Sequence, residues 1–434
     1  MCYTQKGFEF QEKIRKDRFK FTLVNNLIII PVTLNGLELS FILDTGVGGT
    51  ILFSLDKKES LELNNVSKIF IRGFGNDDPV EAIKSTNNRL SIGNAISSNH
   101  TVYMVFDDSI NFSSQMGFPV HGIIGYDFFK DFVVDINYTK KLIKIHDPET
   151  YTYKPCKKCY DTGLDLTHGR KRPLIQMRCK TNEGITDVNL LLDSGSGSAL
   201  WLFENKKRGI HIPKKSFDDF LGKGFNGDIY GKKTKIDRFY IGDFELKEVT
   251  TSFPDSLYTN GVYLHNRHGS IGGSLLKRFN LIIDYPNSKI SFRKNSGFSK
   301  PFYYNMSGLT IEHSGVRVLK DYNIRKATSR PSLEFLNKEE GKIIKEVLKA
   351  DVGGFIYALH PTYKVSDVRP DSPADIAGLK EDDEILEING KASHHYTLSA
   401  INDLFYSEAG KRIKIKVQRL GVIINYTFRL KKVI

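Results

Sequence analysis

The chain has 434 residues, of which 40% are hydrophobic, and it contains 36 glycines, 29 phenylalanines and 20 tyrosines. This composition is typical of a globular protein rich in strands and turns, and it excludes an intrinsically disordered chain. At roughly 150 residues per domain, the length predicts about three domains.

The net charge of +13 comes from 63 Lys and Arg residues that are interleaved with 50 Asp and Glu residues. No basic run is longer than the one in "GRKR" near residue 170, so the charge is spread over the surface. Such a surface attracts anions weakly and without selectivity. We therefore expect no specific nucleic-acid partner, and nucleic-acid binding by this basic segment is the weakest alternative function.

No stretch of about 20 consecutive apolar residues is present, so the sequence predicts no transmembrane helix. The first residues, "MCYTQKGFEFQEKIRK", lack the apolar core of a signal peptide. The sequence as written predicts a cytoplasmic protein. An exported or periplasmic protein is expected instead if the natural start lies further upstream.

A repeated unit fills the first two thirds of the chain. The aspartates of "FILDTG" and "LLLDSG", Asp44 and Asp193, are 149 positions apart, and "RLSIGN" at 89 and "RFYIGD" at 238 have the same separation. "HGIIGYDFFKDF" at 121 and "HGSIGGSLLKRF" at 268 are 147 apart. Three landmarks in the same order at a nearly constant offset predict two copies of one structural unit.

These landmarks divide the chain into five parts. We predict an N-terminal segment at 1–20, a first lobe at 21–148, a linker at 149–172, a second lobe at 173–297 and a C-terminal domain at 298–434. Within each lobe, short apolar stretches alternate with Gly, Asn and Asp turns, and long amphipathic helices are missing from the sequence pattern. Each lobe is therefore predicted to be a small β-barrel.

The linker contains two of the four cysteines, Cys156 and Cys159. A single CxxC is a weak metal signal, so we expect plain linker thiols, no metal and no cofactor. A zinc site completed by Cys179 and His168 is the alternative.

The linker also repeats the first aspartate motif as Asp161-Thr162-Gly163. This copy follows "PCKKCY" and no apolar strand, so no buried element holds its carboxylate in place. It predicts ordinary turn chemistry.

The two motifs at Asp44 and Asp193 follow apolar strands. One such motif alone would be an ordinary Asp-Gly hairpin turn. Two copies come face to face, however, when equivalent lobes pair about a pseudo-twofold axis. Two carboxylates a few ångströms apart cannot both ionise, so we expect the pair to share one proton and to act with a water as general acid and base.

These motifs resemble the aspartic proteases, in particular bacterial relatives of retropepsins in which two protease-like halves precede a PDZ domain. The resemblance covers roughly residues 20–434 and rests on both aspartate motifs and on "GIIG" at 122 and "GSIG" at 269. It implies a mainly β fold, in which two retropepsin-like β-barrel lobes form an intramolecular pseudodimer and an α+β PDZ domain follows. It also implies a monomeric aspartic endopeptidase that acts on peptide or protein substrates.

The resemblance assigns roles to residues of both lobes. Asp44 and Asp193 would be the catalytic dyad, whose loops are cross-braced by hydroxyl groups and supplied with backbone N–H groups. The supporting residues are Thr45, Gly46, Ser194, Gly195 and Ser196. The residues of the two substrate-covering flaps are Gly73, Phe74 and Gly75 in the first lobe and Gly224, Phe225 and Tyr230 in the second.

Two further features bear on pH dependence. Val47 stands where pepsin-like enzymes have a serine, whereas the second loop keeps Ser196, and this asymmetry predicts a less acidic working range than that of pepsin. His121 and His268 precede the two Gly-containing elements at matching positions. Ordinary structural positions are the simpler expectation for them, and coupling of the site to pH is the alternative.

The C-terminal segment "VSDVRPDSPADIAGLKEDDEILEINGK" resembles the centre of a PDZ domain, and "TLSAINDLFYSEAG" predicts an amphipathic helix before two strands. A PDZ domain adds a peptide to a sheet edge and receives its C-terminal carboxylate on exposed N–H groups. The predicted carboxylate loop consists of Ser307, Gly308, Leu309 and Thr310. "VGGFIYAL" at 352 is a rival loop, and an insertion around 318–352, with a predicted helix, interrupts the domain.

The PDZ ligand is expected to be a C-terminal peptide of a substrate, of a partner or of the chain itself, which ends in "RLKKVI". A domain that only packs against the protease lobes is the alternative. For the chain as a whole, the alternative to an enzyme is a catalytically inactive, protease-like scaffold that binds extended peptides.

Overall fold

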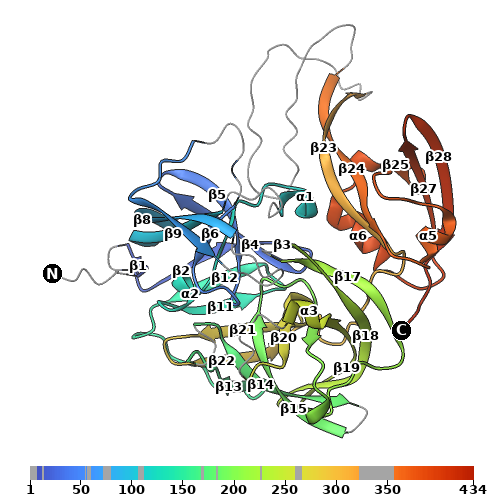
Figure 1. The fold of residues 1–434 in the computed structure, drawn as a ribbon. Coiled ribbons are helices and arrows are strands. Elements are labelled where there is room, and N and C mark those ends of the chain that lie inside the picture. Colours follow the sequence, from blue (N-terminus) through green and yellow to red (C-terminus); the bar gives the residue numbers. More distant parts are fainter. Residues whose placement is uncertain are drawn as a thin grey trace. The chain divides into compact units, whose positions relative to one another are not determined.

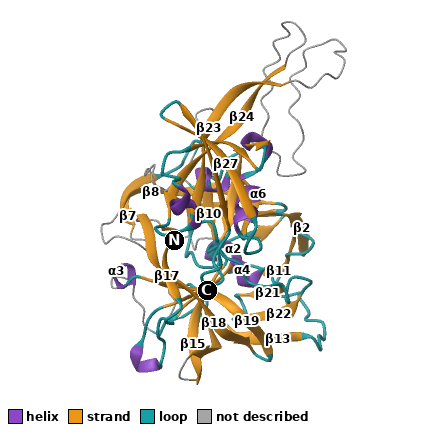
Figure 2. Cartoon of the chain, turned by 90° about the vertical axis from the view of Figure 1, so that its right-hand side faces the viewer, coloured by secondary structure: helices purple, strands orange, loops and turns teal. Residues whose placement is uncertain are grey.

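The computed structural model describes residues 7–11, 14–53, 55, 60–71, 80–105, 112–167, 171–181, 184–224, 227–259, 266–321 and 356–434. The fold is mainly β, as the sequence predicted, and strands dominate Figure 2. The chain divides into two compact units (Figure 1). The first contains residues up to 111, 119–303 and 433–434, and the second contains residues 112–118 and 304–432. No helix in the described part of the chain is long and apolar enough to span a membrane.

The first lobe is a sheet that closes on itself. Its strands are β1 (Glu9–Phe10), β3 (Thr22–Val24), β4 (Leu27–Leu34), β5 (Leu37–Leu43), β6 (Thr50–Leu52), β7 (Val66–Ile71), β8 (Val80–Ile92), β9 (Ala95–Val105) and β10 (Gly122–Ile124). The strand order is β9-β6-β10-β5-β4-β8, and β8 pairs with β9 to close the ring. β10 runs parallel to β5 and antiparallel to β6.

The second lobe repeats this arrangement. Its strands are β14 (Leu174–Thr181), β15 (Gly184–Asp193), β16 (Leu200–Leu202), β17 (Ser216–Gly224), β18 (Gly227–Ile241), β19 (Phe244–Pro254) and β20 (Gly269–Gly272). β20 runs parallel to β15 and antiparallel to β16, and β14 pairs with β18 to close the ring. The helices of the first unit are α2 (Tyr126–Phe129), α3 (Ser256–Thr259), α4 (Gly273–Leu276) and the 3-10 turn η2 (Lys206–Arg208).

A third sheet joins the two lobes in one core. Its strands, in spatial order, are β13 (Cys159–Gly163), β22 (Lys289–Lys294), β21 (Phe279–Asp284), β11 (Val133–Asn137), β12 (Leu142–His146) and β2 (Lys16–Lys20). β11 of the first copy pairs antiparallel with β21 of the second, which places a pseudo-twofold axis between them. The sequence predicted this intramolecular pseudodimer.

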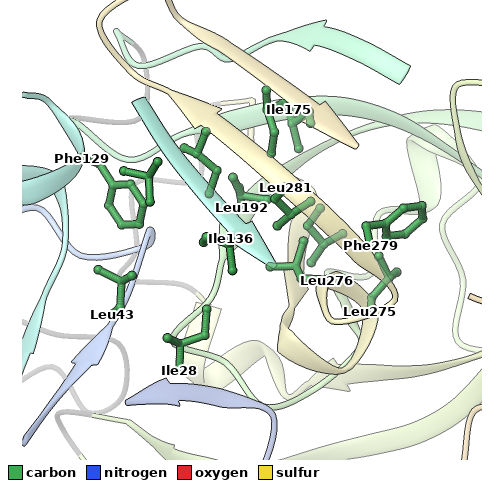
Figure 3. Packing of buried hydrophobic residues seen from close by; sticks show 14 of the residues in the cluster. Ile28, Leu43, Phe129, Ile136, Ile175, Leu192, Leu275, Leu276, Phe279 and Leu281 are labelled. Atoms are coloured by element: carbon green, nitrogen blue, oxygen red, sulfur yellow. The ribbon is translucent and has the colours of Figure 1, made fainter. Parts of the chain in front are cut away.

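Apolar side chains from both copies meet in a single buried cluster. Leu43 and Leu192, which directly precede the two aspartates, belong to the same cluster as Ile136 and Leu281 of the shared sheet. All four are at most 1% exposed (Figure 3). Because buried side chains of a close-packed core have little freedom to move, this packing fixes where the two strands end.

Two predictions about the linker are wrong. Cys156 and Cys159 form a disulfide with a Cα–Cα distance of 5.4 Å, because a two-residue spacer brings them within bonding range. Asp161-Thr162-Gly163 is no turn: it lies in β13, which pairs with β22. No trio of His, Cys, Asp and Glu side chains among the described residues could hold a metal ion.

The second unit contains the PDZ-like sheet. Its strands, in spatial order, are β23 (Leu309–Asp321), β24 (Ile356–Val368), β25 (Glu384–Ile388), β27 (Arg412–Arg419) and β28 (Val422–Arg429), with β26 (Lys391–Ala392) beside β25. The helices are α1 (Ser113–Met116), α5 (Pro373–Ala377), α6 (Leu398–Phe405) and the 3-10 turn η3 (Ser393–His395). The helix predicted within the insertion lies outside the described residues.

Local sequence explains the two helices of the PDZ core. The Ser372 hydroxyl accepts the Asp375 N–H to cap α5, and Pro373 occupies its first turn. The Thr397 hydroxyl accepts the Ala400 N–H in the same way at the start of α6. As the sequence predicted, α6 is amphipathic, and it buries Leu398, Ile401 and Phe405.

Candidate active site

Each lobe delivers one aspartate at the end of a buried strand. Asp44 directly follows β5, and Asp193 is the last residue of β15. The strands pair in parallel with β10 and β20, which belong to the repeated Gly-x-Ile-Gly sequences, and Gly125 directly follows β10. The Asp44 N–H donates to the Ile124 carbonyl at 2.9 Å, which ties the first loop to β10.

Glycines at the ends of these elements allow close backbone approach. A Cβ added to Gly125 would lie 2.3 Å from the Asp44 carbonyl oxygen and 2.4 Å from that of Val47. A Cβ added to Gly272 would lie 2.7 Å from the Ser196 carbonyl oxygen. These positions need glycine because the loops that carry Asp44 and Asp193 press directly against their backbone.

The two loops are cross-braced symmetrically by their hydroxyl groups. The Thr45 N–H donates to the Ser194 hydroxyl, and the Ser194 N–H donates to the Thr45 hydroxyl, both at 3.0 Å. The Thr45 hydroxyl donates to the Leu192 carbonyl at 2.6 Å, and the Ser194 hydroxyl donates to the Leu43 carbonyl at 2.8 Å. Each hydroxyl thus bridges to the opposite lobe.

The brace brings the two carboxyl groups together. A Cβ added to Gly46 would lie 3.0 Å from Oδ1 of Asp193 and 3.1 Å from Oδ1 of Asp44, so these oxygens are at most about 6 Å apart. The Gly46 N–H donates to Oδ1 of Asp44 at 2.6 Å, and the Gly195 N–H donates to the same oxygen at 3.1 Å. One oxygen therefore receives N–H groups from both lobes.

Removal from water and mutual repulsion both disfavour ionisation of the pair. Burial, with the neighbouring Asp193 charge as second cause, raises the pKa of Asp44 to about 7, although the N–H groups of Gly46 and Gly195 oppose the shift. Burial also raises the pKa of Asp193. Near neutral pH the pair can therefore retain a proton, which isolated aspartates do not.

Two arginines near the site were missed from the sequence. The charges of Arg267 and Arg172 oppose the rise in the Asp193 pKa, with Arg267 the stronger of the two. The Arg267 Nε donates to the Gly269 carbonyl at 3.0 Å, and its guanidinium lies over the Phe203 ring at 5.4 Å. Arg267 directly precedes the His-Gly pair of the second copy, but the first copy has a valine at the matching position. The internal repeat therefore did not mark Arg267 as a site residue.

Tyr285 is a third residue that sequence reasoning did not assign to the site. Its hydroxyl donates to the Thr45 carbonyl at 3.2 Å, and its ring lies 5.2 Å from that of Phe129. It extends from the segment after β21 in the shared sheet. Its match to Tyr138 in the repeat pointed to duplication but not to this contact.

The two repeated histidines hold strands together. The Nδ1 atoms of His121 and His268 accept the N–H groups of Ser40 and Asn189, each at 2.9 Å. Both histidines are buried, with exposures of 5% and 6%. The matching bonds to β5 and β15 give them equivalent structural roles.

The predicted flaps are described only in part. Gly73, Phe74, Gly75 and Phe225 lie outside the described residues. Gly224 ends β17, and Tyr230 lies in β18, where it is 41% exposed and 5.6 Å from the Phe220 ring. The hairpin β17–β18 has the position in the second lobe that β7–β8 has in the first, and the flap roles stay predictions.

The predicted carboxylate loop of the PDZ unit directs its N–H groups inward. Ser307 and Gly308 donate to Oδ1 of Asn305 at 3.0 and 3.2 Å, and Leu309 donates to the Ser307 hydroxyl at 3.0 Å. Thr310 is the second residue of β23 and pairs with Asp367 of β24. Of the rival segment "VGGFIYAL", residues 352–355 lie outside the described residues, and the rest forms the start of β24.

Family models agree with this arrangement. An aspartyl protease model matches residues 30–128, and a PDZ domain model matches residues 364–419. No curated protein matches the chain. The chain thus combines an aspartyl protease domain with a C-terminal PDZ domain, as the sequence predicted. The first match includes Asp44, whereas the place of Asp193 rests on the internal repeat and the fold.

Proposed function

We propose that the chain is an aspartic endopeptidase that hydrolyses peptide bonds with a water activated between Asp44 and Asp193. The observation that carries the proposal is the symmetric brace between Thr45 and Ser194, which holds two carboxyl groups from two lobes in one site. A pair that holds one proton contains both a base for the water and an acid for the leaving amine.

The electrostatics favour a division of roles within the pair. Arg172 favours the ionised form of both carboxyl groups, whereas Arg267 acts on Asp193, so Asp193 is the better site for the negative charge and acts as the base. Asp44, whose pKa is raised to about 7, holds the proton and acts as the acid. Ser196 offers a backbone N–H that favours the ionised form of Asp193.

The C-terminal PDZ domain, in this proposal, recognises a peptide or protein.

The test is turnover of a quenched fluorescent peptide library by the full chain and by Asp44→Asn and Asp193→Asn variants. Each substitution should reduce kcat/KM about 10³-fold or more, because neither the acid nor the base can be replaced. Asp161→Asn is the matched control, since it alters the same tripeptide on β13, where Asp161 pairs with Lys289. Equal peptide turnover by the parent chain and by both active-site variants would contradict the enzyme proposal. The alternative, an inactive scaffold that binds peptides, would then remain.

A further inference from the structure

A short segment of the first lobe's sequence is part of the PDZ unit. Residues 112–118 group with the second unit, although the residues on both sides group with the first. Their helix α1 lies against β23 and α6, and Figure 1 shows it beside β23, on the side away from β24. Met116 of α1 is 6% exposed. The segment is therefore an integral part of the packed PDZ unit.

The contact with α6 is close. Gly117 ends α1 with a φ of 75°, in the left-handed region. A Cβ added there would lie 3.0 Å from the Leu398 Cβ in the first turn of α6. A side chain at position 117 would thus be strained by its backbone and would press against α6.

The position of α1 coincides with the expected peptide site. In the described sheet β23 pairs with β24 and forms one end of the strand order, so its other edge is the one to which a PDZ domain adds a peptide. Leu309 and Ile311 of β23, and Leu398 and Ile401 of α6, are all at most 3% exposed. α1 lies against both of these elements.

The hydrogen bonds of the loop at residues 307–309, before β23, indicate that the ligand needs no terminal carboxylate. Its N–H groups at Ser307, Gly308 and Leu309 already donate to Asn305 and Ser307 side chains. A carboxylate would have to displace these bonds, whereas an internal segment need not. The chain's own last two residues group with the first unit, where Ile434 is 3% exposed.

We propose that the PDZ domain is occupied in cis by Phe112–Phe118, and that the ligand it takes is an internal peptide segment and not a free C-terminus. Tethering gives such a segment an effective concentration in the millimolar range, so a free peptide must compete with it. The segment ends four residues before β10, whose Ile124 carbonyl accepts the Asp44 N–H. This inference rests on the peptide-binding role proposed for the PDZ domain, but not on catalysis.

The test measures binding of a labelled peptide to the full chain by fluorescence anisotropy. The probe has the sequence of residues 112–118 with an acetylated N-terminus and an amidated C-terminus, and all chains carry Asp193→Asn so that the probe is not cleaved. Gly117→Val should expel the cis segment through strain and contact with Leu398. We expect this variant to bind the probe about 10- to 100-fold more tightly than the parent chain.

Gly421→Val is the matched control. Gly421 has a φ of 83° in the same unit, but a Cβ there would meet nothing within 4 Å. This variant should bind as weakly as the parent chain. Equal probe affinity of the parent and Gly117→Val would overturn the proposal. The proposal would also be overturned if Gly117→Val bound the peptide "RLKKVI" with its free carboxylate but did not bind the amidated probe.

A second variant covers the case in which Gly117→Val does not fold. Met116 is the buried side chain of α1, and Met116→Asp would bury a charge there without strain in the backbone. This variant should also expel the segment and bind the probe about 10- to 100-fold more tightly than the parent chain. A folded Met116→Asp chain that binds the probe no more tightly than the parent chain contradicts cis occupancy.

Discussion

The Asp44 carboxyl group is held in a balance of opposing effects. The Gly46 and Gly195 N–H groups stabilise its charge at 2.6 and 3.1 Å, yet burial and the charge of Asp193 raise its pKa to about 7. The glycine at 195 makes the contact possible, because a Cβ there would lie 2.2 Å from the Asp44 Cγ. The backbone thus accommodates a charge that the site as a whole disfavours.

This balance predicts that Asp44→Asn stabilises the fold at high pH. A carboxyl group whose pKa rises from 3.8 unfolded to about 7 folded contributes stability below about pH 4 and loses it as pH rises toward 7. Asparagine carries no charge, and its carbonyl can still accept both N–H groups. The free energy of unfolding at pH 8 should rise by on the order of 2–4 kcal/mol, as measured by urea denaturation.

The same measurement at pH 4 is the internal control. There the aspartate is protonated in the fold, so the variant and the parent chain should differ by less than about 1 kcal/mol. A variant that is less stable than the parent at pH 8 would show that the fold does not disfavour this charge.

At the scale of elements, the loops that carry Asp44 and Asp193 support each other through buried hydroxyl groups. Thr45 is fully buried and Ser194 is 2% exposed, so their hydrogen bonds have no competition from water. Tyr285 adds a bond from the shared sheet to the Thr45 carbonyl. The position of each aspartate therefore depends on the opposite lobe.

Removal of one hydroxyl should destabilise both loops. Thr45→Val keeps the shape but leaves the Ser194 N–H and the Leu192 carbonyl without their partner. An unsatisfied buried group costs about 1–3 kcal/mol, and guanidinium denaturation should show a loss of this size. Thr45→Ser keeps the hydroxyl and should lose less than half as much. A loss in Thr45→Val that is no larger than the loss in Thr45→Ser would contradict this role of the hydroxyl group.

Patterns in the sequence predicted those elements whose signals are local or repeated. The helical spacing of apolar residues such as Leu398 and Ile401 predicted α6, and the offset between Asp44 and Asp193 predicted paired lobes. The Asp161 motif was misjudged because an exposed edge strand has no apolar run, and it forms here by pairing with β22. The cysteine bond was missed because a CxxC spacing fits a thiol pair, a metal site and a disulfide equally well.

At the scale of the whole molecule, the duplication explains why two aspartates meet, but it does not explain the nearby arginines or the packing of residues 112–118. The pairing of β11 with β21 makes one core from two copies, and this fixes the ends of β5 and β15. Arg267 and Arg172 have no repeated counterpart and approach the site only through the fold. Nor does any sequence pattern indicate that residues 112–118 pack with a domain about 200 positions further on.

The pH dependence of kcat/KM for the library peptides tests most directly whether Asp44 and Asp193 share one proton. Activity should fall as pH rises past about 7, where Asp44 loses its proton. It should also fall on the acid side as Asp193 becomes protonated, at a pH above the usual value of 3.8 because its pKa is raised. The account predicts a bell-shaped curve between these limits. A maximum near pH 2, or a rate that still increases above pH 8, would contradict a shared proton.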